Sequence, residues 1–220
     1  MKKMAIAAAA GLLGSLALAG TAGAAHDTNP SAKVARYTYD LGAVQPSDVP
    51  GTRADGVTRI VALPNGKVQV KVDAWGLAPG LPHAMHLHGV PGPATDDACP
   101  GPDAAGADGV VTVLDGAPFY GGIVTSLTTT GDTSPASALA LDRFPVADED
   151  GRISYSRTFR DDAGHLDAGT VQVVVHGADF DGNGAYAFDP DDAFASRSSS
   201  LGASIPLEAT VPVLCGGIAN

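Results

Sequence analysis

Residues 56–76 read GVTRIVALPNGKVQVKVDAWG and carry the clearest structural signal in the chain. Within them, the run KVQVKVDAW (67–75) alternates strictly between apolar and polar residues. Its three valines would lie on one face of an extended chain, with Gln69, Lys71 and Asp73 on the other. This period of two predicts a half-buried antiparallel strand.

Asn65 and Gly66 separate two such runs, which is the strongest short-range signal for a β-hairpin. No sustained helical period appears, and residues 141–150 should form at most one helical turn before Pro145. We expect strands at 34–42, 56–63, 67–76, 83–89, 109–114, 151–159, 170–177 and 203–214. The sequence therefore predicts an all-β fold: a Greek-key β-barrel or sandwich of about eight antiparallel strands. Its long loops, at 90–108 and 116–150, are expected to carry function.

The N-terminal residues 1–25 combine two lysines, an apolar run broken by glycines and a small-residue end. This composition predicts a secretory signal peptide rather than a membrane span, because the apolar run is short. Cleavage after Ala24 or Ala25 would leave a single domain over residues 26–220, secreted or periplasmic. Cleavage after Ala25 would also expose His26 as an N-terminal copper chelate, although a disordered tail is the favoured interpretation.

The charge balance argues against some classes of binding partner, and the cysteines indicate the redox state of the compartment. The chain has 13 Lys and Arg against 24 Asp and Glu, a net charge of −11, which becomes −13 once Lys2 and Lys3 leave with the signal. Such a surface argues against nucleic acid and anionic membranes as partners. Cys99 and Cys215 would both be exported, so one disulfide is favoured over two separate buried thiols.

Three of the six histidines fall within LPHAMHLHGV (81–90). On a strand, His86 and His88 would share one face, about 7 Å apart, while His83 would point to the other. The pair could converge on one metal ion, or it could lie on the surface of an edge strand. His176, at the end of an apolar strand, offers a third ligand, although it could equally be a strand terminus that faces water.

Four motifs in one order resemble those of copper–zinc superoxide dismutases, over roughly residues 56–220. GLAPGLPHAMHLHG (76–89) is similar to the family's Gly-Leu-x-Pro-Gly-x-His-x-x-His-x-His segment. VQVVVHGADFDGNG (171–184) resembles the later strand that carries the last copper histidine and its Asp/Gly-rich turn. VLCGGIAN (213–220) looks like the family's C-terminus, and Cys99 is placed like the disulfide partner of its cysteine.

The resemblance implies that His86, His88 and His176 are copper ligands. It implies a structural role for His83, which matches a family histidine that does not bind metal. His165 is similar to another loop histidine that is not a ligand.

The Asp/Gly-rich turn that follows His176 resembles a turn that supports the metal ligands in the family. Asp179 and Asp181 match the turn where the family keeps a carboxylate that orients the metal histidines. The same turn resembles the start of a calcium loop, but Pro190 stands where a bidentate Glu is needed.

The chain also departs from the family. Between Cys99 and His165 there is no histidine, so zinc is not expected and the site should hold copper alone. The family's anion-guiding arginine is replaced by Pro212, and Arg143 and Arg197, which lie in or near loops, could substitute for it.

The resemblance therefore implies an exported copper-binding protein that could dismutate superoxide to oxygen and hydrogen peroxide. Two alternatives stay open: a copper-sequestering protein without turnover, and a chordin-type β module that binds no metal. Copper or superoxide would be the small-molecule ligand, and a homodimer would be consistent with the family.

Overall fold

The computed structural model describes residues 34–89, 98–161 and 170–217. Eight strands form one antiparallel sheet: β1 (Ala35–Ala43), β2 (Asp55–Ala62), β3 (Lys67–Trp75), β4 (Met85–Gly89), β5 (Gly122–Ser126), β6 (Ile153–Arg160), β7 (Gln172–His176) and β10 (Pro212–Gly216). A short ribbon pairs β8 (Ser198–Ser199) with β9 (Gly202–Pro206), and α1 (Val113–Tyr120) is an α-helix. Four 3-10 turns complete the described elements: η1 (Pro102–Ala104), η2 (Pro135–Ser137), η3 (Leu141–Arg143) and η4 (Leu207–Ala209).

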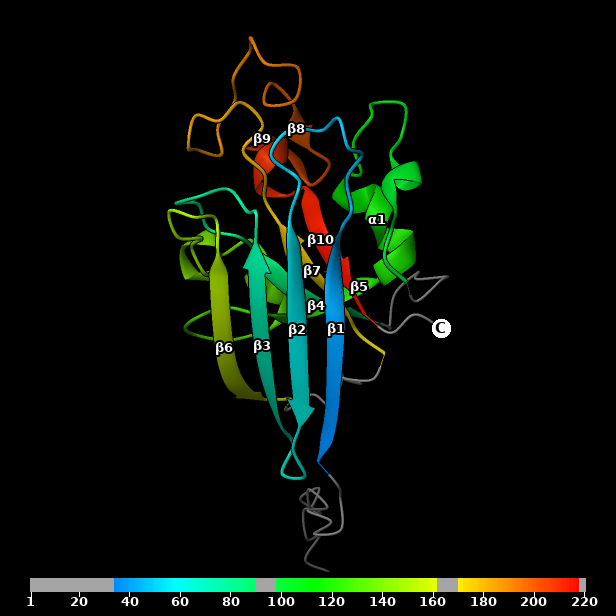
Figure 1. Cartoon of the computed structure of the whole chain (residues 1–220), viewed down its shortest axis with the longest axis vertical. Coiled ribbons are helices and arrows are strands. Elements are labelled where there is room, and N and C mark those ends of the chain that lie inside the picture. Colours follow the sequence, from blue (N-terminus) through cyan, green and yellow to red (C-terminus); the bar gives the residue numbers. More distant parts are fainter. Residues whose placement is uncertain (1–33, 90–97, 162–169, 218–220) are drawn as a thin grey trace, which may run out of the picture.

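The sheet runs in the order β5-β4-β7-β10-β1-β2-β3-β6 and curls back on itself. In Figure 1, strands β6, β3, β2 and β1 form the front wall, and β10, β7, β4 and β5 lie behind them. The non-consecutive pairs β3–β6 and β4–β7 are those of a Greek key. The predicted all-β fold of eight antiparallel strands is therefore confirmed.

The predicted hairpin joins β2 to β3. The amide of Leu63 donates to the carbonyl of Lys67 over 2.8 Å, and the amide of Gly66 donates back to Leu63 over 3.1 Å. Gly66 has a φ of 74°, a left-handed conformation that favours glycine at this position of a short hairpin loop. The resulting register buries the alternate valines of β3 in the core between the two walls.

The strand predicted at 109–114 is wrong. Val110 and Val111 are fully buried, but the main chain of Val111 pairs with the side-chain amide of Gln45 instead of a neighbouring strand. Thr112 and Asp115 then form a capping box, which starts α1 at the next residue.

Two further strand predictions need correction. Strand β5 lies inside the region 116–150, where a long loop was expected. The sequence did not indicate this strand because a five-residue run is too short to show a period. The segment 203–214 is not one strand, since η4 separates β9 from β10. By contrast, η3 is the short turn expected before Pro145.

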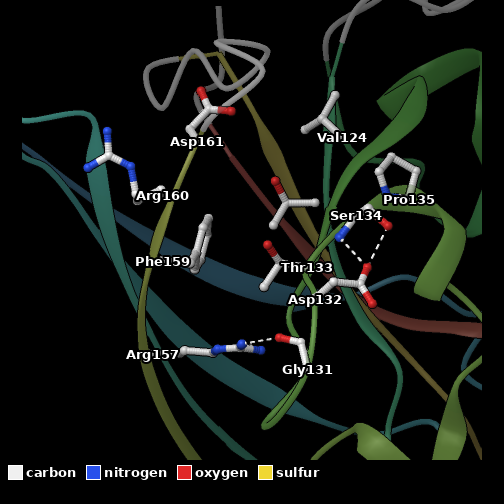
Figure 2. Close-up of a pocket in the computed structure, with 11 residues that line it drawn as sticks. Val124, Gly131, Asp132, Thr133, Ser134, Pro135, Arg157, Phe159, Arg160 and Asp161 are labelled. Carbon is white, nitrogen blue, oxygen red and sulfur yellow. Dashed lines mark hydrogen bonds between the residues drawn. The ribbon is translucent and has the colours of Figure 1, made fainter.

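The two end strands of the sheet, β5 and β6, face one another across a seam. The hydroxyl of Tyr155 donates to the carbonyl of Thr128 over 3.2 Å, and Arg157 donates to that carbonyl over 2.6 Å and to Gly131. A cavity of about 440 Å³ opens beside these contacts (Figure 2). Side chains, rather than a backbone ladder, thus link this part of the seam.

Candidate metal centre

Strand register places three histidines on one face of the sheet. His86 and His88 alternate along β4, and the amide of His176, at the end of β7, donates to the carbonyl of Ala84 over 2.8 Å. His176 therefore stands opposite Ala84 and shares the face of His86 and His88. The intervening Met85 and Leu87 belong to the core. We call His86, His88 and His176 the histidine triad.

Loops and α1 cover this outer face. Val44, Val111, Tyr120, Val174 and Cys215 form a small apolar cluster there, against which Cys99 packs. Cys99 and Cys215 form a disulfide, as predicted. The triad is buried as a result, with 4%, 2% and 4% of His86, His88 and His176 exposed.

The three rings converge. One nitrogen of each ring lies within 4.8 Å of one nitrogen of each of the others. The ring centroids of His86 and His176 are 5.1 Å apart, and those of His86 and His88 are 5.7 Å apart. The sequence predicted that His86 and His88 would share a face, and the structure brings His176 together with them.

Each ring uses one nitrogen to contact a main-chain carbonyl. Nε2 of His86 lies 3.2 Å from the oxygen of Ala138, and Nδ1 of His88 lies 3.0 Å from that of Gly121. Nδ1 of His176 lies 2.8 Å from the oxygen of Thr210. A carbonyl can only accept, so these nitrogens carry the proton and each ring is locked in one tautomer.

The opposite nitrogens are the available ones. Nδ1 of His86, Nε2 of His88 and Nε2 of His176 are buried and have no hydrogen-bond partner within the described residues. With the outer nitrogens protonated, these three carry lone pairs. An unsatisfied buried polar atom is costly, and three that converge are explained by a ligand they share. The triad could therefore hold a metal ion.

Electrostatics keep the triad in the form that binds metal. Burial, followed by the charge of the neighbouring His176, lowers the pKa of His88 to about 3, and burial lowers the pKa of His176 to about 4. The pKa of His86 lies well below its ordinary value, first because of burial and then because of the other two rings. All three imidazoles are neutral at pH 7, as ligation requires.

His83 contacts the triad only through the main chain. Its side chain is fully buried, with Nδ1 3.0 Å from the carbonyl oxygen of His176 and Nε2 3.1 Å from that of Ala78. It thereby ties the end of β7 to the segment before β4. These are the contacts of a packing residue.

A second cluster, which we call the acidic turn, joins Asp179 and Asp181, in the turn after β7, to Glu208 of η4. Their carboxylates lie within 4.8 Å of one another. The predicted orienting role of Asp179 and Asp181 has no counterpart in the hydrogen bonds: main-chain carbonyls contact the outer nitrogens of the triad. Asp179 instead accepts from the amides of Gly182 and Gly184, and Asp181 from Asn183. These carboxylates shape their own turn.

A cavity of about 350 Å³ opens onto the triad, and we call it the apolar cavity. Its largest apolar groups are Val113, Ile123, Leu139 and Leu201. None of its described lining residues is charged.

The two arginines proposed as anion guides lie elsewhere. Arg143 contacts Asp132 over 3.2 Å and Ser137 over 2.6 Å, and Arg197 pairs with Asp108. Neither lines the apolar cavity.

Sequence reasoning missed the groups that orient the triad. They are the carbonyls of Gly121, Ala138 and Thr210, which belong to three separate loop segments. Every residue has a carbonyl, so no residue type marks these positions. The one local signal is Gly121, which follows the last residue of α1. Its φ of 75° is a left-handed conformation, and a glycine in the sequence is the residue that indicates such a helix end.

Comparisons with models of known families, with curated proteins and with solved structures find no match to this chain. The family resemblance thus rests on the sequence motifs. The disulfide indicates an oxidising, extracellular environment, while the predicted signal peptide, His26 and His165 lie outside the described residues. None of the helices in the described ranges is long and apolar enough to span a bilayer.

Proposed function

We propose that this chain is an exported copper-binding protein of the superoxide dismutase family, which holds one copper ion with His86, His88 and His176 and binds no zinc. The convergence of three buried ring nitrogens without hydrogen-bond partners carries this proposal. Three neutral imidazoles suit copper in both common oxidation states, and divalent copper binds such donors most tightly among the first-row metals.

The surrounding residues prepare the triad for a metal. The carbonyls of Gly121, Ala138 and Thr210 hold the outer N–H groups and aim the inner lone pairs at one point. Apolar neighbours keep bulk water from the rings and keep the rings neutral. A bound copper ion would supply a one-electron couple.

Superoxide dismutation has weaker support than copper binding. Fast capture of an anion benefits from cations at the mouth of a site, and the apolar cavity is lined by no charged residue among those described. The net charge of −11 adds long-range repulsion. We therefore propose copper holding as the main function and treat superoxide decay as one arm of the test.

A chordin-type module without metal is also less well supported. In such a protein the three inner nitrogens would stay buried without partners, at a cost of about 1–3 kcal/mol each. Three such penalties at a single point are difficult to reconcile with a purely structural role.

The test is copper and zinc analysis of the mature protein, as purified and after copper loading, with a superoxide-decay assay on the same samples. We expect one copper per chain, no zinc and slow decay. His88→Ala should abolish stoichiometric binding because it removes one of three ligands, and His165→Ala serves as the matched histidine control that keeps it. Unchanged copper content in His88→Ala would reject the site, and fast decay would establish a dismutase.

A further inference from the structure

The apolar cavity has one wall of nitrogen lone pairs and otherwise offers apolar surface. Besides the triad, its one polar side chain among the described residues is Thr210. The hydroxyl of Thr210 already donates to Ser199 over 2.7 Å. A molecule in the cavity therefore meets hydrocarbon on most sides and hydrogen-bond acceptors on one.

This lining discriminates by charge. An anion that enters must give up its hydration, and without a metal it finds only lone pairs at the triad, which repel it. An uncharged molecule with an apolar body loses little hydration, and an N–H or O–H group on it could donate to Nε2 of His88 or His176. Apolar cavities of this kind take up ring-sized organic molecules.

We infer that the apolar cavity of the metal-free protein binds small, uncharged organic molecules with an apolar body and one donor group, and that it disfavours anions. The inference rests on the proposed function, since the donor group of these molecules would compete with copper for the inner nitrogens of the same three histidines. It adds the chemical class of ligand that the site admits.

The mouth of the cavity supports entry from solvent. Leu139, which follows η2, is 52% exposed, and Leu201, between β8 and β9, is 46% exposed, yet both line the cavity. Side chains that line a cavity and also meet solvent form its rim. Among the described residues, the rim therefore presents hydrocarbon, and not a cation, to an incoming ligand.

Benzamide and benzoate test the inference, because they have nearly the same shape and differ in charge and in the donor group. Binding to the mature full-length chain, stripped of metal with a chelator, is measured by calorimetry. We expect benzamide to bind at least about tenfold more tightly than benzoate. Equal binding, tighter binding of benzoate, or no binding of either at millimolar concentration would overturn the inference.

Variants locate the effect at the rim. Leu139→Arg should reduce the benzamide preference by about tenfold, because a guanidinium at the rim attracts benzoate. Leu201→Lys tests the second exposed residue of the rim in the same way. Val34→Arg is the matched control, since Val34 is also an exposed apolar residue, 38% exposed, and does not line the cavity. A preference that survives both rim variants would contradict the assignment.

Two parallel measurements separate the possible failures. Copper content of an aliquot of the same preparation, measured after reloading with copper, reports on the proposed function: copper bound without benzamide preference rejects only the ligand class, whereas no copper bound rejects the metal centre. Sedimentation reports on self-association. A dimer that Leu139→Arg dissociates would show that the rim is an interface between two copies, and the inference would fall.

Discussion

Among the residues that the structure describes, two groups of side chains each bring three potential metal ligands within 4.8 Å of one another: the histidine triad and the acidic turn. They differ in what their ligand atoms already contact. In the triad, each inner nitrogen is buried without a hydrogen-bond partner. In the acidic turn, each of the carboxylate oxygens of Asp179, Asp181 and Glu208 accepts a hydrogen bond from nearby N–H groups.

The difference shows that proximity alone does not define a metal site. Glu208 is fully buried, and it accepts from the amides of Phe180 over 2.7 Å and Ala187 over 3.2 Å. Its carboxylate thus has a role in folding the turn without any ion. The triad has no such role, because its inner lone pairs point at one another and contact nothing among the described residues. Clustered ligands indicate a binding site when their lone pairs are left available by the fold.

Acid should have the largest effect, and it acts on the triad. Above pH 6.5 the three histidines are neutral in both the folded and the unfolded chain, so stability is fully present. Below pH 6.5 the unfolded chain takes up protons, while the folded pKa values of about 4 for His176 and about 3 for His88 prevent uptake. The unfolding free energy of the metal-free protein should therefore fall by about 1.4 kcal/mol per pH unit for each histidine, from pH 6.5 towards 4.

Denaturant titrations at several pH values measure this slope. His88→Gln keeps a neutral polar side chain at the position and removes one titrating group, so its slope should be shallower by about 1.4 kcal/mol per pH unit. The same slope in the variant and the wild type would mean that His88 is not held neutral by burial.

Metal ions should have a somewhat smaller effect on the unfolding free energy than acid, and this effect should differ between the two clusters. Copper at about a thousandfold excess over its Kd should raise the unfolding free energy by about 4 kcal/mol, because it binds only the folded triad. Millimolar calcium should change it by close to zero, since the oxygens of the acidic turn already accept hydrogen bonds. Thermal melts with each ion measure both effects. Stabilisation by calcium comparable to that by copper would show that the acidic turn is also a metal site, and the two clusters would then not differ in this respect.

Substitution in the acidic turn should have the smallest effect, and it should be on stability alone. Glu208→Ala leaves the amides of Phe180 and Ala187 without an acceptor, which should lower the unfolding free energy by about 2–4 kcal/mol. Glu208→Gln keeps one carbonyl acceptor and should lose about half as much. Copper stoichiometry should stay the same in both variants. Loss of copper binding in a folded Glu208→Gln protein would show that the two clusters are coupled.

The local sequence pattern was enough to predict the structure wherever a short stretch of chain determines its own conformation. The alternation of KVQVKVDAW and the Asn65–Gly66 turn led directly to the hairpin of β2 and β3. The shared face of His86 and His88 followed from the same period of two. Pattern failed at 109–114, where the side chain of Gln45 takes the place of a neighbouring strand, and at β5, which is too short to show a period.

The sequence by itself determined the all-β class, the hairpin and the face on which His86 and His88 lie, because these depend on residues close together in the chain. The sequence motifs implied that His176 joins them, and tertiary structure brings it there. Tertiary structure alone decided that main-chain carbonyls of Gly121 and Thr210 orient the rings, and that none of the described residues lining the cavity above them is charged. Each of these depends on which segments pack together across more than thirty residues. Backbone carbonyls and available lone pairs leave no mark on residue identity, so only the folded chain reveals them.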